Sequence, residues 1–144
     1  MNGIGYMLYD LLRQNWALLL VLGLLAGAWL FLRTPADDLS VEVFHQEIRS
    51  GRPLVVEFFS NTCSVCLMSK PAVDRLEREL DGKAKVLRIN VMSQSGLALA
   101  REYGVVAVPT FIVFDGKGQV VYAQAGPPDR AAIRAAVTGP GGPE

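Results

Sequence analysis

The sequence predicts an α/β domain, with a mixed β-sheet and helices on both faces, preceded by one N-terminal transmembrane helix. Three observations predict this architecture. The apolar run LVVEFF, residues 54–59, is rich in β-branched and aromatic residues and suits a buried central strand. Helical and strand-like segments alternate along the domain, and the last two strands are joined by a glycine-rich turn. A long apolar segment without charges precedes the domain.

Length and charge limit the number of domains and the classes of partner. A chain of 144 residues suggests one domain, large enough to bury its own core. The 14 Lys and Arg residues match the 14 Asp and Glu residues in number, so no basic excess points to nucleic acid. Two cysteines are too few for a disulfide framework, so their number does not indicate the redox compartment.

The apolar segment Trp16–Leu32 contains no charged residue. At 1.5 Å per residue it gives about 26 Å of helix, near the lower limit for crossing a hydrocarbon core of ~30 Å. We interpret residues 15–33 as a transmembrane anchor in the lipid bilayer, residues 1–14 as a short N-terminal tail and residues 34–39 as a linker. Two alternatives stay open, a cleaved signal peptide with a small-residue site at 26–28 and a buried core helix.

The positive charges around this segment give a weak signal for its orientation. Arg13 and the terminal amine precede the segment and Arg33 follows it, so the positive-inside count is nearly tied. The short leading segment favours a signal anchor whose N-terminus stays inside. We therefore expect a single-pass protein of the cytoplasmic membrane, with its soluble domain on the extracytoplasmic side.

Residues 40–138 are interpreted as the folded domain, and residues 139–144 as a flexible tail. Ser40 can cap a first helix, and Pro71 lies inside the helix that follows the cysteines, where its missing N–H predicts a kink. The helices are expected at 41–50, after Cys63, at 95–104 and at 128–137, and the strands at 54–59, 85–91, 110–115 and 119–124. Crossovers early in the chain predict parallel pairing, and the final hairpin adds an antiparallel edge.

Both cysteines lie in FFSNTCSVCLMSKP, residues 58–71, directly after the predicted central strand. Cys63 falls where the strand ends and the helix begins, and a helix N-terminus favours the thiolate form. Cys66 is one turn further, so it can resolve a mixed disulfide formed by the first sulfur. A permanent disulfide and a metal site are the alternatives. No metal is expected, because a structural zinc needs about four ligands and no second Cys pair or His cluster is present.

VVEFFSNTCSVCLMSKP, the later VVAVPTFIVFDGKGQVV and Gly126 resemble the thioredoxin family over residues 40–137. A proline eight residues after Cys63 and the Val-Pro-Thr before the hairpin are part of this resemblance. It implies a thioredoxin-like fold in which Cys63 is the nucleophile and Cys66 the resolving thiol.

The resemblance implies roles for further residues. Glu57 matches a buried acid that helps to move the proton of Cys66, and burial should raise the pKa of such a carboxyl group. The alternative for Glu57 is an exposed position at a sheet edge. Pro109 matches a cis proline that faces the disulfide, and a trans proline in a plain loop is its alternative. The expected substrate-binding residues are Val108, which offers its backbone to an extended segment, and Thr62, Ser64, Val65 and Gly126.

The sequence Thr62-Cys63-Ser64-Val65-Cys66 departs from the Trp-Cys-Gly-Pro-Cys that is usual in the family. Because the two intervening residues tune the reduction potential, the direction of electron transfer stays open. By analogy we expect a membrane-tethered thiol–disulfide oxidoreductase that reduces protein partners, as in cytochrome c maturation. No cofactor is expected besides the Cys63–Cys66 disulfide, and a membrane partner is expected as the electron donor. The alternatives are a disulfide oxidase or isomerase and a non-enzymatic subunit of a membrane assembly.

Overall fold

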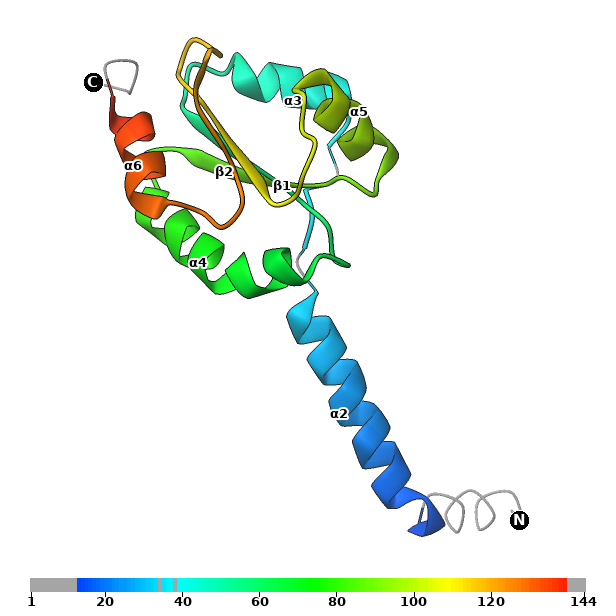
Figure 1. The fold of residues 1–144 in the computed structure, drawn as a ribbon. Coiled ribbons are helices and arrows are strands. Elements are labelled where there is room, and N and C mark those ends of the chain that lie inside the picture. Colours follow the sequence, from blue (N-terminus) through cyan, green and yellow to red (C-terminus); the bar gives the residue numbers. More distant parts are fainter. Residues whose placement is uncertain (1–12, 34, 38, 140–144) are drawn as a thin grey trace, which may run out of the picture. The chain divides into compact units, whose positions relative to one another are not determined.

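The computed structural model describes residues 13–33, 35–37 and 39–139 of the chain. Contacts divide the chain into two units, one ending at Arg33 and the other beginning at Thr34. The first unit contains the helix α2, and the second contains the sheet and the helices around it (Figure 1). The expected tails, 1–14 and 139–144, lie almost entirely outside the described residues.

The helix α2 runs over Trp16–Leu32 and has 17 residues. Its large apolar side chains are exposed, with exposed fractions from 47% at Leu19 to 73% at Leu24. Within the described residues, no helix is both long enough and apolar enough to cross a membrane. The physical reason is length, since 1.5 Å per residue makes α2 about 26 Å long against a hydrocarbon core of ~30 Å. The structure therefore does not support the transmembrane helix predicted at 15–33.

The sheet of the second unit has the strand order β2–β1–β3–β4. The strand β1 (Leu54–Phe59) pairs parallel with β2 (Lys85–Asn90) and antiparallel with β3 (Thr110–Phe114). The strand β4 (Val120–Ala125) pairs antiparallel with β3 at the edge. The predicted mixed sheet is confirmed, and its central strand is the apolar run LVVEFF.

The helices of this unit begin at side chains that accept a hydrogen bond from the first turn. They are α3 (Val41–Ile48), α4 (Ser64–Leu80), α5 (Gln94–Glu102) and α6 (Arg130–Thr138). Their caps are Ser40, Cys63, Ser93 and Asp129. Because the first N–H groups of a helix have no partner inside it, such caps fix where a helix begins. The helix α4 continues through Pro71.

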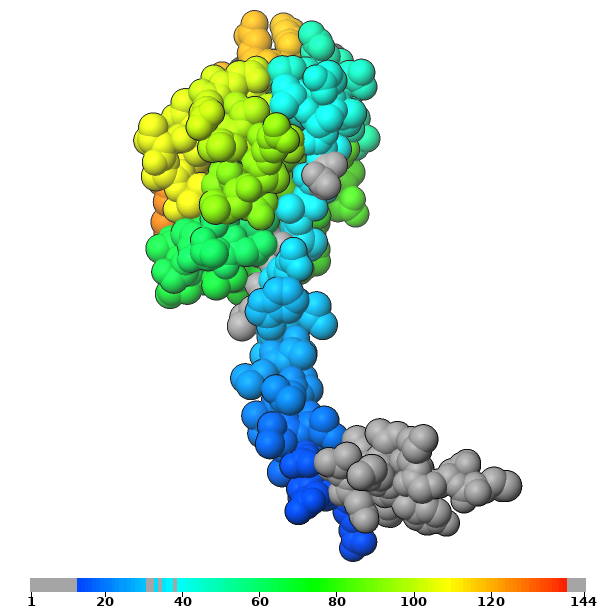
Figure 2. Space-filling view, turned by 90° about the vertical axis from the view of Figure 1, so that its right-hand side faces the viewer, coloured from blue at the N-terminus to red at the C-terminus, as the bar shows by residue number. Residues whose placement is uncertain are grey.

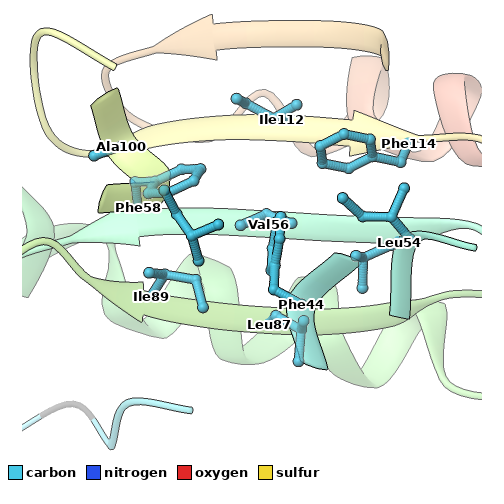
Figure 3. Packing of buried hydrophobic residues seen from close by; sticks show 11 residues of the cluster. Phe44, Leu54, Val56, Phe58, Leu87, Ile89, Ala100, Ile112 and Phe114 are labelled. Atoms are coloured by element: carbon cyan, nitrogen blue, oxygen red, sulfur yellow. The ribbon is translucent and has the colours of Figure 1, made fainter. Parts of the chain in front are cut away.

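Helices cover both faces of the sheet, α3 and α5 on one face and α4 and α6 on the other (Figure 1). On the first face, Phe44 of α3 packs against alternate residues of β1, namely Leu54, Val56 and Phe58 (Figure 3). On the second face, Val55 packs against α4 and α6 through Val73, Leu76, Ile133 and Val137. A strand buried on both faces favours a continuous apolar run, which explains the composition of β1.

Alternation along β1 places Glu57 on the same face as Val55, the face that α4 covers. In the parallel register with β2, Glu57 lies opposite Arg88. Two charged residues are therefore neighbours in the interior of the domain, on the face of the sheet that is covered by the helix that begins at the cysteines.

Candidate active site

The two cysteines lie at the junction of β1 and α4. The amide of Cys63 donates to the carbonyl of Ser60 at 3.2 Å, which closes the turn after the strand. Cys63 is the cap of α4, and its Sγ accepts a hydrogen bond from the amide of Cys66 at 3.3 Å. Both thiols are free, with Cys63 half-buried and Cys66 only 4% exposed. The pair therefore offers one accessible sulfur and one buried sulfur.

The loop before β3 lies against the accessible sulfur. The Sγ of Cys63 donates to the carbonyl oxygen of Val108 at 3.6 Å, and the Val108–Pro109 peptide bond is cis. Gly126, with a φ of 98°, donates its amide to the carbonyl of Pro109 at 2.8 Å and so ties the end of β4 to this loop. In Figure 2, α5 and the segment that follows it lie next to the start of α4. Segments far apart in sequence thus meet at Cys63.

The carboxyl group of Glu57 is buried, with 2% of the residue exposed. Within the described residues, its Oε2 has no hydrogen-bond partner. Burial raises the pKa of Glu57 from 4.5 to about 7, and the nearby charge of Arg88 opposes that shift. The alternative of an exposed glutamate at a sheet edge is wrong, because β1 is the central strand. Glu57 can therefore exchange a proton near neutral pH.

Arg88 is buried beside Glu57 and contacts three carboxylates. Its Nε lies 3.8 Å from Oε2 of Glu57. Its Nη2 lies 2.7 Å from Oδ1 of Asp74 and 2.9 Å from Oε2 of Glu77, both on α4. Lys70 also binds Asp74, with 3.0 Å between Nζ and Oδ2. The result is a charged cluster between β1, β2 and α4.

Cys66 shares this environment with Glu57. Burial raises the pKa of the Cys66 thiol to about 12, and the hydrogen bond with Cys63 and the charge of Glu57 act in the same direction. Cys66 therefore keeps its proton near neutral pH unless a base takes it. The interaction between the two groups is reciprocal, since a charge on one disfavours a charge on the other.

The structure brings most of the predicted site residues together. Thr62, Ser64 and Val65 are exposed around Cys63, with Val65 42% exposed. Thr62 is held by a hydrogen bond of 2.8 Å between its Oγ1 and the Oγ of Ser60. Val108, Pro109 and Gly126 lie on the other side of Cys63, through the contacts described above.

Sequence reasoning missed the charged cluster around Glu57. The sequence predicts only a strand over the residues around Arg88 and a helix over those around Asp74 and Glu77. A signal was present, because Lys70, Asp74 and Glu77 follow Cys66 at spacings of four, four and three residues and so share its helix face. The sequence does not show that these residues form a cluster with Glu57, because that depends on the strand register that places Arg88 opposite Glu57.

A sequence profile of the thioredoxin family matches residues 36–139. The chain belongs to the thioredoxin family. The thioredoxin of Rickettsia felis is 32% identical over 80 residues, which cover 55% of this chain and 74% of that protein. Thioredoxin 1 of Nostoc sp. is 33% identical over 87 residues, covering 60% of this chain and 78% of that protein.

Solved structures agree on the fold. Mitochondrial thioredoxin 3 of Saccharomyces cerevisiae, in its oxidised form, matches with a TM-score of 0.59 and 22% identity, over 68% of this chain and 88% of that chain. The domain therefore has the thioredoxin fold. Family membership and the Cys63–Cys66 pair make this chain a thiol–disulfide oxidoreductase.

The raised pKa of Glu57 predicts how stability depends on pH. Between pH ~4.5 and ~7 the folded state keeps a proton that the unfolded chain loses, so the free energy of unfolding falls as pH rises. The loss is complete above pH ~7 and amounts to about 3 kcal/mol, at ~1.4 kcal/mol per pKa unit. We expect Glu57→Gln to be more stable than the unchanged protein at pH 8 by about this amount, and little different at pH 4.

Urea unfolding of both proteins at pH 4, 6 and 8 measures this difference. Glu79→Gln is the matched control, because Glu79 pairs with Arg130 and Arg134 at the surface side of α4. A gain in Glu57→Gln that is the same at every pH would contradict the prediction, since the cause would then not be ionisation.

Proposed function

We propose that this oxidoreductase reduces disulfides of protein partners, with Cys63 as the nucleophile and Cys66 as the resolving thiol. The observation that carries the assignment of roles is the asymmetry of the two sulfurs. Cys63 is the accessible one and caps α4, whereas Cys66 is buried with a thiol pKa raised to about 12 by burial. The similarity to proteins named thioredoxin supports the reductive direction.

The reaction transfers two electrons from the cysteine pair to the partner. The thiolate of Cys63 attacks one sulfur of the partner disulfide, and the other partner sulfur leaves as a thiolate. Cys66 then loses its proton and attacks Sγ of Cys63. This step breaks the mixed disulfide, releases the second partner thiolate and leaves a Cys63–Cys66 disulfide. The partner is reduced and the pair is oxidised.

Glu57 is proposed to accept the proton of Cys66 in the second step. Its raised pKa of about 7, caused first by burial, lies close to physiological pH, which suits a general base. Cys66 and Glu57 also affect each other electrostatically. A direct transfer or one through a water molecule would serve equally, because neither changes the proton balance.

The surface around Cys63 is proposed to bind an extended segment of the partner. The carbonyl of Val108 already accepts a hydrogen bond from Cys63, and it stands beside the sulfur that the partner must approach. Exposed Thr62, Ser64 and Val65 border the same sulfur, and Gly126 fixes the loop through Pro109. Main-chain contacts would let partners of different sequence bind.

The apolar helix α2 is proposed to hold the protein at a lipid bilayer, with the domain on the extracytoplasmic side of the cytoplasmic membrane. Exposed leucine side chains on a helix without charges support association with lipid. A membrane partner would then re-reduce the Cys63–Cys66 disulfide. Reduction of cytochrome c apoprotein is one partner reaction that fits this location.

The reduction potential tests the proposed direction. We expect the Cys63–Cys66 pair of the full chain to equilibrate with graded dithiothreitol or glutathione near about −270 mV, the value typical of thioredoxin. A value near about −120 mV would instead make the protein a disulfide oxidase. A pair that cannot be cycled would favour the non-enzymatic assembly subunit.

Single cysteine variants test the two roles. We expect Cys66→Ser to accumulate mixed disulfides with partner proteins, because Cys63 still attacks and no resolving thiol remains. Cys63→Ser is the matched control and should accumulate none. The measurement is electrophoresis without reductant, after alkylation in acid. Equal accumulation of mixed disulfides in the two variants would contradict the assignment of Cys63 as the nucleophile and Cys66 as the resolving thiol.

Membrane fractionation tests the proposed location. We expect the full chain to stay with membranes through a carbonate wash, and a Leu20→Asp/Leu24→Asp variant to be released, because each charge costs about 2.5–3.5 kcal/mol in an apolar membrane helix. Cys63 should react in intact cells with a maleimide that cannot cross the membrane. Release of the unchanged protein would refute membrane attachment, and protection of Cys63 would refute the extracytoplasmic side.

A further inference from the structure

The guanidinium group of Arg88 lies among three carboxylates but does not contact them equally. Its Nη2 makes short contacts with Asp74 and Glu77, at 2.7 and 2.9 Å. Only its Nε approaches Glu57, at 3.8 Å from Oε2, which is too long for a hydrogen bond. Glu57 is the least exposed of the three carboxylates, and it also has the weakest interaction with the Arg88 guanidinium.

The position of Arg88 is fixed at its backbone. Its amide donates to Oδ2 of Asp37 at 2.8 Å, and its carbonyl accepts from the amide of Asp37 at 2.9 Å. The parallel register with β1 holds the other side of the strand. Because the backbone cannot shift, the direction in which the guanidinium points decides how close it comes to Glu57.

Hydrogen bonds with Asp74 and Glu77 determine the direction in which the Arg88 guanidinium points. They lie one turn apart on α4, so both can reach the same nitrogen. Charged hydrogen bonds of this length are stronger than an ion pair at 3.8 Å that lacks a hydrogen bond. Lys70 holds the other oxygen of Asp74 at 3.0 Å, which fixes that carboxylate in place.

We propose that Asp74 and Glu77 are positioning residues that hold the Arg88 guanidinium away from Glu57 and thereby keep the Glu57 carboxyl able to exchange a proton. The inference rests on the proposed role of Glu57 in moving the proton of Cys66. Without the two acids, Arg88 would turn to the unpaired Oε2 of Glu57 and hold it as a carboxylate. A Glu57 carboxylate held by Arg88 is a weaker base, so it would take the proton of Cys66 less readily in the resolving step.

The groups that face Glu57 come from two elements. In the described residues, β2 contributes Arg88, and α4 contributes Lys70, Asp74, Glu77 and Cys66. On β3, the residue opposite Glu57 is Phe111, which carries no charge. The two acids raise the pKa of Glu57, whereas Arg88 and Lys70 lower it, so the balance depends on how these four side chains are arranged.

The test is the titration of Glu57 in the full chain with reduced cysteines. The carbon-13 carboxyl signal of Glu57, assigned by its loss in Glu57→Gln, gives the midpoint directly. We expect Asp74→Asn/Glu77→Gln to lower this midpoint by about one pH unit or more, because a hydrogen bond from Arg88 would favour the charged form of Glu57. The pH at which the rate of disulfide reduction reaches half its maximum should move down with it.

Two further variants keep the test decisive. Glu79→Gln, on the same helix but paired with Arg130 and Arg134, should leave the midpoint unchanged. Glu77→Gln alone serves if the double variant does not fold, because this side chain is 54% exposed, and it should give a smaller shift in the same direction. An unchanged midpoint in the double variant would overturn the proposal.

The Arg88→Met background separates positioning from direct repulsion. If the two acids act through Arg88, their removal should shift the midpoint much less in this background. An equal shift would overturn the proposal, because the acids would then act on Glu57 directly. The proposed role of Glu57 in the reaction fails separately, namely if Glu57→Gln leaves the rate of disulfide reduction unchanged at every pH.

Discussion

The carboxyl group of Glu57 is buried in a strand whose six residues are all buried, and the site is arranged around this desolvated group. Burying an acid in a sheet is unfavourable unless a cation or a hydrogen bond compensates. Arg88 compensates only in part, because its main contacts are with Asp74 and Glu77. The part of the desolvation cost that Arg88 does not offset raises the pKa of Glu57 to about 7, so Glu57 can gain or lose a proton near neutral pH.

The two cysteines also differ in burial, because Cys63 is accessible and Cys66 is buried. Cys63 ends the turn after β1 and remains accessible, while Cys66, in the first turn of α4, is buried and is affected by the charge of Glu57. In the proposed reaction, the accessible sulfur reacts with the partner protein and the buried sulfur gives its proton to Glu57. The division arises because Cys63 is the cap at the accessible start of α4, whereas Cys66 lies inside its first turn and is buried.

The accessible side of the site is built by loops that the sheet holds in place. The loop before β3 contacts Cys63 through Val108, and Gly126 at the end of β4 fixes the next residue of that loop. Because β3 pairs with both β1 and β4, the cysteine turn, the proline loop and Gly126 all lie at one end of the sheet. The sheet thus holds in place the irregular backbone around Cys63, which is the surface proposed to bind the partner.

The sequence by itself determined the order of the elements, the central strand and the cysteine pair, because apolar periodicity, caps and turn residues are local signals. It also singled out Glu57, since an acid inside an apolar run stands out. It also predicted a transmembrane helix at residues 15–33, which the structure does not support, since α2 has only 17 residues. Only the tertiary structure decided that Arg88 lies opposite Glu57 and that Asp74 and Glu77 hold it. These contacts depend on strand register and on the packing of α4 against the sheet, and neither is encoded in the spacing of residues along one element.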